Sequence, residues 1–545
     1  MLSYHSEMNF LSRRSPVLGV GGMVATSQPL AVAAGLEILR QGGNAADAAV
    51  GTAAALNVTE PTSTGIGGDC FALFYEADSR EISALNGSGR APGLLNIPML
   101  KQEGFEDELP PFHAHTITVP GAAAGWTDLV EKHGRLSISQ VLAPAIKLAE
   151  EGIPVGPVTA YFWERGVGRQ LSQARNGTEL TTDGRAPKPG EIFRNPGLAR
   201  TLRMLAEIGK PAFYEGEIAD AIVEVVRASG GVMAKEDLAA HTSTWETPIS
   251  TTFHDHRVWE CPPNGQGIAA LLALNILEGF DLSGWVPMSV ERLHVEIEAM
   301  RLAFADTRWF VADPRTHPAP IEELLSKEYA GRRRKLIDPT RATVDPRRGI
   351  PVPGSDTVYL TAVDEAGNAC SFINSNYMGF GTGIVPKGWG FSLQNRGHGF
   401  SLDPAHPNAL APHKRPYHTI IPAMITYRDS GELFASLGVM GGFMQPQGHM
   451  QVALGLVHDD LDPQAALDLP RFCITDGTAS GRIALEEGIP VEVMAGLAQM
   501  GHNVIPVSGQ GRAVFGRGQV ILRDNASGVL WGGSDPRADG LAMSL

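Results

Sequence analysis

Cysteine is scarce in this sequence, which has four cysteines among its 545 residues. The four lie far apart and form no CxxC pair, so neither a disulfide framework nor a zinc site of paired cysteines is expected. They are Cys70, Cys261, Cys370 and Cys473. Long apolar runs are missing as well: no stretch of about eighteen apolar residues occurs, and we therefore expect no membrane-spanning helix. Unpaired thiols are typical of a reducing compartment, which predicts a cytoplasmic protein.

Basic residues are also in the minority, with 44 Lys and Arg against 59 Asp and Glu, for a net charge of −15. Because binding to a phosphate backbone requires a basic face, we expect no nucleic acid partner. Near the start, Arg13 and Arg14 precede a weakly apolar stretch, Ser15 to Val24, which can be read as a twin-arginine signal. Pro16 and three glycines interrupt that stretch, so we instead expect residues 1–21 to form an arm leading into the first strand.

What is present is an alternation of helical and strand patterns. Apolar residues recur at helical spacing in PLAVAAGLEILRQGG, which starts at Pro29, and Gly42 and Gly43 end that pattern. Asn44 can cap a second helix, NAADAAVGTAAALNV, which is apolar almost all round and should be buried against a sheet. The loop TSTGIGGD, from Thr62, leads into the strand CFALFYEA. Further strands and long helices follow, so the pattern predicts a mixed α/β protein without internal repeats.

Two segments are expected to be exposed connectors. Residues 171–195 are polar and rich in Gly, Asn, Thr and Pro. Residues 331–356 contain a run of basic residues, followed by Pro351, Pro353 and Gly354. This composition argues against a regular helix or a central strand. We interpret residues 331–356 either as a surface linker or as a tether that must come apart.

A hairpin is expected directly after this tether. TVYLTAVD, which starts at Thr357, is rich in β-branched and aromatic residues, and DEAGN is a turn signal before the second strand, ACSFINSNYM. Pairing centred on Ala366 joins residues whose numbers sum to 732, which places Thr357 opposite Ser375. By pattern alone, the two hydroxyls fit the edge of an ordinary hairpin.

Several motifs occur in the same order in a known family. They are GMVATSQPLAVAAGLEILRQGGNAADAAV from Gly22, TSTGIGGDCF, TVPGAAAGW at 118–126, GSDTVYLTAVDEAGNACSFINSNYMGFGTGIV, and GVMGG at 438–442. From about residue 22 to its C-terminus the chain resembles the γ-glutamyltransferase family of N-terminal-nucleophile hydrolases. The resemblance implies an α+β fold, a four-layer αββα sandwich, in which a single intertwined domain is made as one precursor.

The resemblance also implies self-cleavage and a mechanism. Members of the family cut themselves before a threonine, here Thr357, which would leave residues 1–356 and 357–545 associated as a heterodimer. A hydroxyl needs an adjacent base to act as a nucleophile, and the freed α-amine, which titrates near neutral pH, is a base on the same residue. Ser375 matches the second hydroxyl of the family, which hydrogen-bonds the nucleophile.

Gly441 and Gly442, within GVMGG, match the oxyanion-hole pair of the family. Glycine suits this role because a backbone N–H group can approach the oxyanion with no side chain in between. In isolation the same residues are typical of a tight turn. The implied mechanism uses no cofactor and no metal, so the expected partners are a small-molecule amide and the other fragment. Further pairing of the heterodimer stays open.

Departures from the family concern the part of the site that binds the acyl group. Gly399, in LQNRGHGF, stands where members that handle γ-glutamyl groups have an aspartate for the α-amino group. Tyr377 replaces an asparagine. The position of the carboxylate-binding arginine reads Ser88, although Arg90 stands directly before the Ala-Pro pair that follows it.

Other departures add cationic or polar groups. His418 and Thr419 replace paired serines, Arg396 replaces a glutamine, and His398 lies two residues further on. Such a pocket favours an acyl group with a carboxylate and no ammonium, since an unpaired buried ammonium is costly. The bulk of Tyr377 favours a small acyl group. We therefore expect a self-processing amidohydrolase for an oxamate-like amide or a dicarboxylic monoamide, with γ-glutamyl hydrolysis or transfer as the alternative.

Three other functions fit the sequence less well. Histidine pairs such as His113 and His115, or His254 and His256, suggest a metal enzyme, but no HExxH motif or Cys/His zinc spacing occurs. GIGGD lacks the full GxGxxG motif and the acidic residue about 20 positions later, which argues against a dinucleotide site. An unprocessed, non-catalytic homologue is disfavoured because the nucleophile, its partner hydroxyl and the oxyanion glycines are all present.

Overall fold

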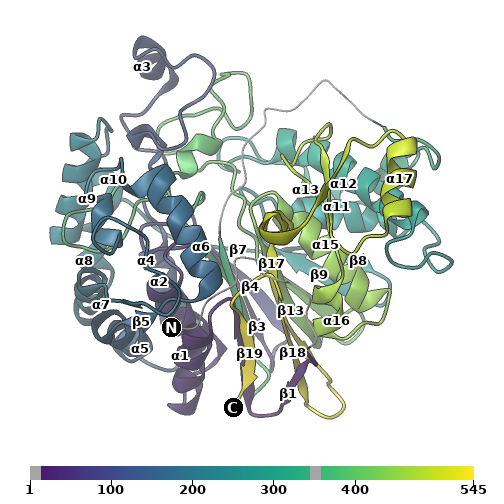
Figure 1. Ribbon diagram of the computed structural model, residues 1–545, viewed down its shortest axis with the longest axis horizontal. Helices are drawn as coiled ribbons and strands as arrows, with labels where there is room; N and C mark the ends of the chain where they lie inside the picture. The colour runs from purple at the N-terminus through teal and green to yellow at the C-terminus, as the bar shows by residue number, and fades with distance from the viewer. Residues whose placement is uncertain (1–13, 344–356) are drawn as a thin grey trace.

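Two seven-stranded antiparallel sheets lie face to face at the centre of the molecule, and helices cover both outer surfaces (Figure 1). The computed structural model describes residues 14–343 and 357–545. The two sheets contact each other through their central strands and through the strands along one edge of each sheet. The four-layer αββα arrangement that the resemblance implied is therefore confirmed.

Both sheets are continuous across the molecule. The first contains, in spatial order, β1 (Val17–Gly19), β18 (Leu530–Ser534), β17 (Arg517–Arg523), β13 (Leu433–Met440), β12 (Ala423–Tyr427), β9 (His256–Glu260) and β8 (Ile249–Phe253). The second contains β19 (Leu541–Ser544), β2 (Gly22–Thr26), β10 (Val358–Asp364), β11 (Ala369–Ser375), β3 (Asp69–Glu76), β4 (Glu81–Gly87) and β7 (Thr244–Glu246). Two small sheets lie outside them: β14 (Phe472–Ile474), β15 (Ile483–Glu486) and β16 (Val504–Val507), and β5 (Ile153–Pro154) with β6 (Ile192–Phe193).

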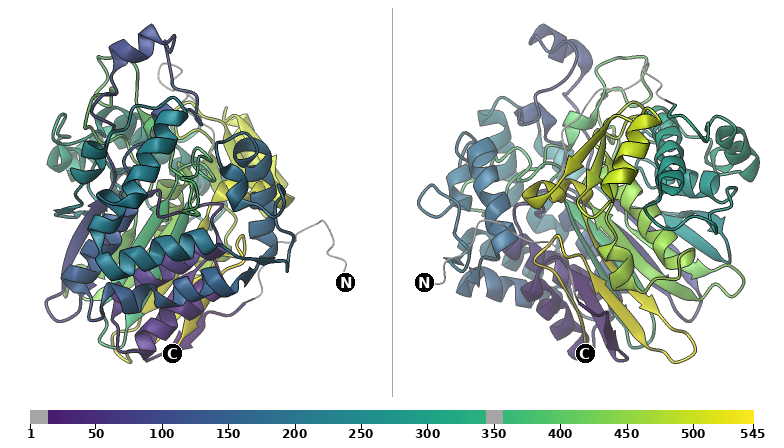
Figure 2. Two further views of the ribbon diagram at one scale, coloured as in Figure 1. Left: turned by 90° about the vertical axis from the view of Figure 1, so that its left-hand side faces the viewer. Right: turned by 45° about the vertical axis from the view of Figure 1, so that its right-hand side comes forward.

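Helices from the N-terminal part of the chain cover the second sheet, and they stand in front of it in the left view of Figure 2. They are α1 (Pro29–Arg40), α2 (Ala45–Thr59), α4 (Ala122–His133), α5 (Ile138–Glu151), α7 (Pro196–Ile208), α8 (Lys210–Tyr214) and α9 (Glu217–Ala228). The first sheet is covered by a layer containing α11 (Ile268–Leu277), α12 (Val290–Phe310), α14 (Lys327–Arg334), α15 (Met444–Val457) and α16 (Pro463–Asp468). The remaining helices are α3 (Ile97–Gln102), α6 (Pro157–Gly166), α10 (Lys235–Ala239), α13 (Ile321–Leu324), α17 (Val491–Gln499), and the short helices η1 (Ala114–Thr116), η2 (Val167–Leu171), η3 (Gly177–Leu180), η4 (Arg396–Gly399) and η5 (Gly509–Phe515).

Both sheets mix strands from before and after Thr357. In the second sheet, β10 begins one residue after Thr357 and pairs with β2 on one side and with β11 on the other. In the first sheet, β12 pairs with β9, and β18 pairs with β1. The parts of the chain on either side of Thr357 thus form a single intertwined unit, as expected.

Helix α2 is buried along its whole length, as its apolar surface predicts. Asn44 Oδ1 accepts hydrogen bonds from the backbone N–H groups of Ala46 and Asp47, and the Asp47 carboxylate accepts one from Asn44 N. A cap of this kind typically stabilises a helix by about 1 kcal/mol. The helix packs on β10 and β11, the two strands of the predicted hairpin.

The connectors contain more regular structure than their composition predicts. Residues 331–334, assigned to the irregular tether, form the last turn of α14. Ser326 Oγ caps this helix by accepting from Tyr329 N at 3.1 Å, and Arg332 pairs with Glu328 one turn earlier. In the other connector, η3 and β6 are formed.

The arm and the tether are described only in part. Val17–Gly19, within the predicted arm, form the edge strand β1. Arg13 and the rest of residues 1–13, together with residues 344–356 of the tether, lie outside the described residues. The division of the chain at Thr357 therefore remains a prediction.

The four cysteines are buried free thiols, and burial raises the pKa of each. Because the thiolate is the reactive form of cysteine, none of the four is a candidate nucleophile. Across residues 14–343 and 357–545, no helix is both long and apolar enough to cross a membrane.

Candidate active site

The β10–β11 hairpin brings Thr357 and Ser375 together. Its register pairs Val358 with Asn374, so paired residue numbers sum to 732 as the sequence predicts. The Thr357 hydroxyl donates to Ser375 Oγ over 3.2 Å, and both side chains are fully buried. The two hydroxyls therefore belong to the interior of the molecule and not to an exposed hairpin edge.

Gln445, in the first turn of α15, is a third polar group at Thr357. Its Nε2 donates to Thr357 Oγ1 over 3.4 Å, while its Oε1 accepts from Ile421 N at 3.0 Å. Because the amide is held at both ends, its N–H stays directed at the hydroxyl oxygen. Thr357 Oγ1 thus donates one hydrogen bond and accepts another.

Gly441 and Gly442 form the turn between β13 and α15. Their φ angles are +131° and +61°, a region that residues with a Cβ rarely adopt. The carbonyl of Gly442 accepts from Gln266 Nε2 at 2.8 Å, and the same nitrogen donates to Thr419 O at 2.7 Å. Gln266 therefore joins this turn to the segment that carries Thr419.

Arg396 is the cation of the site, and its side chain is fully buried. Nη1 donates to Thr419 Oγ1 over 2.7 Å and Nη2 to Ser375 Oγ over 3.4 Å. The guanidinium carbon lies 4.1 Å from the centroid of the Tyr377 ring, a cation–π arrangement. Tyr377 has φ = +82°, and its backbone N–H donates to Ser375 Oγ. The structure thus brings four of the predicted residues together.

Burial leaves the charge of Arg396 poorly matched. Desolvation lowers the pKa of Arg396 to about 10, although Tyr377 and Asp69 act in the opposite direction, so the guanidinium stays charged at neutral pH. Its hydrogen-bond acceptors are neutral hydroxyls, and among the described residues its Nε has no partner. A buried cation in these surroundings favours the binding of an anion.

Asp69 is a buried anion that acts on Arg396 through space. His418 Nε2 donates to Asp69 Oδ2 over 3.0 Å, and His418 Nδ1 accepts from Ile420 N at 3.4 Å, which defines the neutral tautomer. Burial lowers the pKa of His418 to about 3, and the charge of Arg396 adds to that effect. Burial opposes ionisation of Asp69, but hydrogen bonds from His418 and Gln394 and the charge of Arg396 outweigh it and lower its pKa. His418 is therefore a neutral partner of Asp69 and not a second cation.

The glycine-rich loop TSTGIGGD passes close to the end of β11. A Cβ on Gly68 would lie 2.2 Å from the carbonyl oxygen of Ser375, so only glycine fits there. Gly121, in TVPGAAAGW, donates its N–H to both Gly68 O and Asp69 Oδ1. The two motifs therefore pack the backbone around Asp69 and do not form a phosphate-binding loop.

Arg90 is not brought to this site. Its Nη1 donates to Thr242 O over 3.4 Å, and burial, together with the charge of Arg315, lowers its pKa. In the part of the chain that the structure describes, no contact of Arg90 reaches Thr357 or Arg396. The substrate-binding role expected for Arg90 has no support in this geometry.

His398 contacts Tyr377 and not Thr357. His398 Nδ1 donates to Leu109 O over 2.7 Å, and its ring centroid lies 6.5 Å from that of Tyr377. His398 therefore supports the aromatic ring that underlies Arg396.

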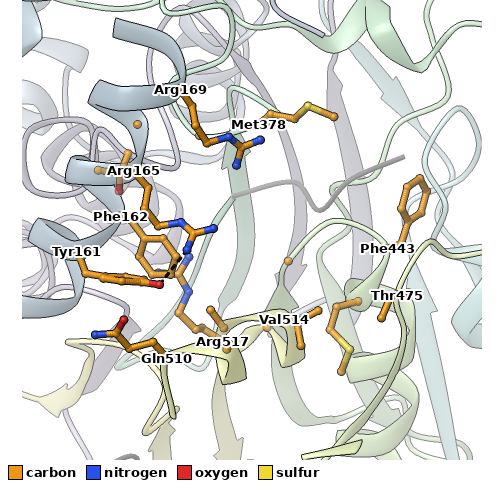
Figure 3. A pocket seen from close by; sticks show the side chains of 18 of the residues that line it. Tyr161, Phe162, Arg165, Arg169, Met378, Phe443, Thr475, Gln510, Val514 and Arg517 are labelled. Carbon is orange, nitrogen blue, oxygen red and sulfur yellow. Dashed lines mark hydrogen bonds between the residues drawn. The ribbon is translucent and has the colours of Figure 1, made fainter. Parts of the chain in front are cut away.

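A cavity of about 390 Å³ opens beside Gly441 (Figure 3). Its walls come mainly from α6, η2, η5, the loop after β11, the turn before α15 and the start of β17, and we call it the Gly441 cavity. Arg165 and Arg169 project toward it from one side and Phe443 lies on the other. Because Gly441 is part of its wall, the cavity adjoins the turn that matches the oxyanion hole.

The pair His113 and His115 has partners within the protein. His113 Nδ1 accepts from His115 N, and His115 Nε2 pairs with Glu103 at 2.7 Å. Within the described ranges, no group of three or more His, Cys, Asp or Glu residues is arranged to hold a metal ion.

Three polar residues at the site were not predicted from the sequence: Asp69, Gln266 and Gln445. Each lies next to a glycine-rich turn, in GIGGD, NGQG and GGFMQ. A polar residue beside such a turn is the signal that the sequence offers, since functional residues concentrate in loops that a rigid scaffold positions.

Comparisons with known proteins agree with this geometry. Residues 31–545 match the family model described as gamma-glutamyltranspeptidase. The chain is 46% identical to the cephalosporin acylase from Bacillus halodurans, whose crystal structure superposes with a TM-score of 0.91 over 100% of this chain and 99% of that chain. It is 36% identical to the glutathione hydrolase-like YwrD proenzyme of Bacillus subtilis, covering 97% of this chain and 99% of that protein. It is 33% identical to the oxamate amidohydrolase proenzyme of Klebsiella pneumoniae, covering 96% and 98%. The chain therefore belongs to the gamma-glutamyltranspeptidase family and is an enzyme of the amidohydrolase and acyltransferase type.

Proposed function

We propose that the chain is a self-processing amidohydrolase whose nucleophile is Thr357, once this threonine has become an N-terminal residue. The proposed substrate is a small amide whose acyl group carries a carboxylate, of the oxamate or dicarboxylic-monoamide kind. The observation that carries the proposal is Arg396, which is buried and charged, has neutral hydrogen-bond acceptors and lies beside Ser375 Oγ. Similarity to an oxamate amidohydrolase and a cephalosporin acylase supports it.

In the proposed reaction, the α-amine of Thr357 takes the proton of its own hydroxyl as Oγ1 attacks the amide carbonyl carbon. The carbonyl oxygen becomes an oxyanion, which the N–H groups of Gly441 and Gly442 stabilise. The ammonium then gives its proton to the leaving nitrogen, the C–N bond breaks and the acyl group remains as an ester on Thr357. Water attacks this ester by the same route and releases the acid. Ser375 and Gln445 hold the attacking oxygen in place.

Self-processing is tested by the size of the purified protein. The 58.0 kDa chain should give fragments of about 38 and about 20 kDa, in proportion to residues 1–356 and 357–545, which remain associated as a heterodimer. The smaller fragment should begin Thr-Val-Tyr-Leu, and the Thr357→Ala chain should stay uncut. A fully active enzyme that runs as a single band on a denaturing gel contradicts both the cut and the nucleophile. An uncut and inactive wild type would instead support a non-catalytic homologue.

The acyl group is tested with two p-nitroanilides that differ only in an ammonium group, glutaryl-p-nitroanilide and γ-glutamyl-p-nitroanilide. We expect a higher kcat/KM for the glutaryl compound, because an ammonium near Arg396 meets no anionic partner in direct contact. Arg396→Ala should lower kcat/KM for the glutaryl compound on the order of 100-fold, as loss of one partner of a buried charge pair does. Butyryl-p-nitroanilide, which lacks the carboxylate, should be affected far less.

The alternative, γ-glutamyl hydrolysis or transfer, is favoured by the similarity to a glutathione hydrolase-like protein. That alternative would be established if kcat/KM for the glutaryl compound were well below kcat/KM for the γ-glutamyl compound and if Arg396→Ala left both values unchanged. Ammonia release from oxamate then shows whether the site accepts a two-carbon acyl group, as we expect because Tyr377 limits the length of the acyl chain.

A further inference from the structure

The Gly441 cavity is cationic, although the chain as a whole carries a net charge of −15. Among the described residues that line it, the charged side chains are Arg165, Arg169 and Arg517, and no carboxylate is present. The other walls include aromatic rings of α6 and of the turn after Gly441. A cleft with charge of one sign concentrates ligands of the opposite sign.

Two of the three arginines are available to a ligand. Arg517 is buried and its Nη1 lies 3.0 Å from Glu60 Oε1, so its charge is matched within the protein. Arg165 donates to a tyrosine hydroxyl one turn earlier in α6, and Arg169 lies near a phenylalanine ring. In the described part of the chain neither of these two has a carboxylate partner. Both are exposed, and both project toward the cavity (Figure 3).

The backbone that carries these two arginines is fastened to the loop after β11. They stand on α6 and on η2, a π-helical turn that continues α6. Gln170, the buried neighbour of Arg169, donates from Nε2 to Met378 O at 2.7 Å and to Gly381 O at 2.6 Å. Those carbonyls follow β11, the strand that ends at Ser375. Gln170 therefore fastens η2 to the loop next to the candidate active site.

The position of the cavity indicates which end of the substrate it receives. Arg396 and Tyr377 are fully enclosed, which suits the acyl group, because that group stays bound through both steps of the reaction. The Gly441 cavity is open to solvent, which suits the amine, because the amine must leave and water must enter before the second step.

We propose that the Gly441 cavity binds the leaving amine, and that Arg165 and Arg169 select amines that carry a carboxylate. The aromatic walls receive the apolar body of the amine, while the guanidinium groups donate charge-assisted hydrogen bonds to its carboxylate. This subsite rests on the proposed function for its place in the reaction, but its affinity for an aromatic carboxylate can be measured without turnover.

The test compares two leaving groups that differ by one carboxylate, 4-nitroaniline and 5-amino-2-nitrobenzoate, each joined to the same glutaryl group. The mature wild type should show a higher kcat/KM for the carboxylated anilide. Arg165→Gln/Arg169→Gln should lower that value about tenfold, in line with loss of hydrogen bonds to a charged group, and should lower the value for the plain anilide less. Arg165→Lys/Arg169→Lys should keep part of the preference, since the charge remains.

Binding and a matched control complete the experiment. Calorimetry should show that the wild type binds 5-amino-2-nitrobenzoate more tightly than 4-nitroaniline, and that the double glutamine variant loses this difference. Arg40→Gln, which removes one exposed arginine at the end of α1, should change neither the kinetics nor the binding. The preference should also weaken as the salt concentration rises.

The outcomes separate this subsite from the proposed function. The subsite would be overturned if the double glutamine variant lost equal kcat/KM for both leaving groups, or if its loss depended on the carboxylate of the acyl group instead. Equal binding of the two amines by the wild type would overturn it as well. If neither anilide is cleaved but 5-amino-2-nitrobenzoate still binds through the two arginines, the subsite stands and the proposed function fails.

Discussion

The carboxylate of Asp69 accepts hydrogen bonds from four segments of the chain. Oδ1 accepts from the backbone N–H groups of Gly89 and Gly121 and from Gln394 Nε2, at 2.9, 3.1 and 2.9 Å. Oδ2 accepts from His418 Nε2 at 3.0 Å. Because every partner is a donor, the position requires an ion or a group that only accepts.

Replacement of this residue by the isosteric amide, Asp69→Asn, should therefore destabilise the protein. The amide Nδ2 would face the Nε2–H of His418, which leaves a buried donor unsatisfied at a cost of about 1–3 kcal/mol. Loss of the anion also lowers the pKa of Arg396 further. We expect a lower melting temperature of the Asp69→Asn variant. Asp183→Asn, at an exposed turn, is the control, and equal melting of the two variants would contradict the assignment.

The sequence predicts some of these residues, but it does not predict their proton positions or the directions of their side chains. Hairpin pairing alone leads from Thr357 to Ser375, because the turn between them is short. The tautomer of His418 is set by its hydrogen bond to Asp69, which lies 349 positions away in the chain, so no local pattern contains it. Arg90 lies two residues from the family position, and only the path of its loop sends the side chain to Thr242 and away from the site.

At the scale of elements, the turn between β13 and α15 carries a testable requirement for glycine. Gly442→Val should lower turnover on the order of 10²–10³-fold, because a β-branched residue at φ = +61° is strained, and relaxing the strain turns the backbone N–H away from the oxyanion. The measurement is kcat for a chromogenic amide, together with the melting temperature of the purified variant.

Gly528→Val separates strain from catalysis. Gly528 lies in the turn between β17 and β18, has φ = +75° and has open space where a Cβ would be. The Gly528→Val variant should lose about as much stability as the Gly442→Val variant, but its turnover should stay close to that of the wild type. If Gly442→Val keeps near-normal turnover, the turn is not the oxyanion hole.

Elements were predictable where one pattern dominates, and not where two effects compete. The apolar surface of α2 and its Asn44 cap specify one buried helix, which the structure confirms. In residues 331–334 the composition indicates irregular chain, yet the preceding cap at Ser326 and the ion pair between Arg332 and Glu328 extend α14 through them. Local stabilisation one turn earlier therefore outweighs composition.

At the scale of the whole molecule, the response of stability to pH contains a contribution from His241. This residue is half-buried and stacks on the Tyr214 ring, and among the described residues neither of its buried ring nitrogens has a hydrogen-bond partner. Burial, with a smaller effect of Arg415, lowers its pKa from 6.5 to about 3. The folded protein keeps His241 neutral, whereas the unfolded chain takes up a proton below pH 6.5, so stability is lost as the pH falls from 6.5 toward 3.

His241→Phe should remove this loss without breaking a hydrogen bond. The free energy of unfolding of the variant minus that of the wild type should be about 2 kcal/mol larger at pH 5 than at pH 7.5. Melting temperatures of both proteins at the two pH values measure it. His317→Phe, which replaces an exposed histidine, should show no such gain, and a pH-independent difference for His241→Phe would refute the contribution.

Strand β10 lies between β2 and β11, so its neighbours come from both sides of Thr357, and both sheets are shared in the same way. If the chain is cut before Thr357, as we propose, neither fragment contains all the strands of either sheet. Refolding of the denatured mature enzyme then becomes a second-order reaction whose rate rises with protein concentration, while the uncut Thr357→Ala chain refolds at a rate independent of dilution. Under the proposed processing, the precursor is thus the folding unit, and the mature enzyme inherits a fold that its separated chains regain only by meeting each other.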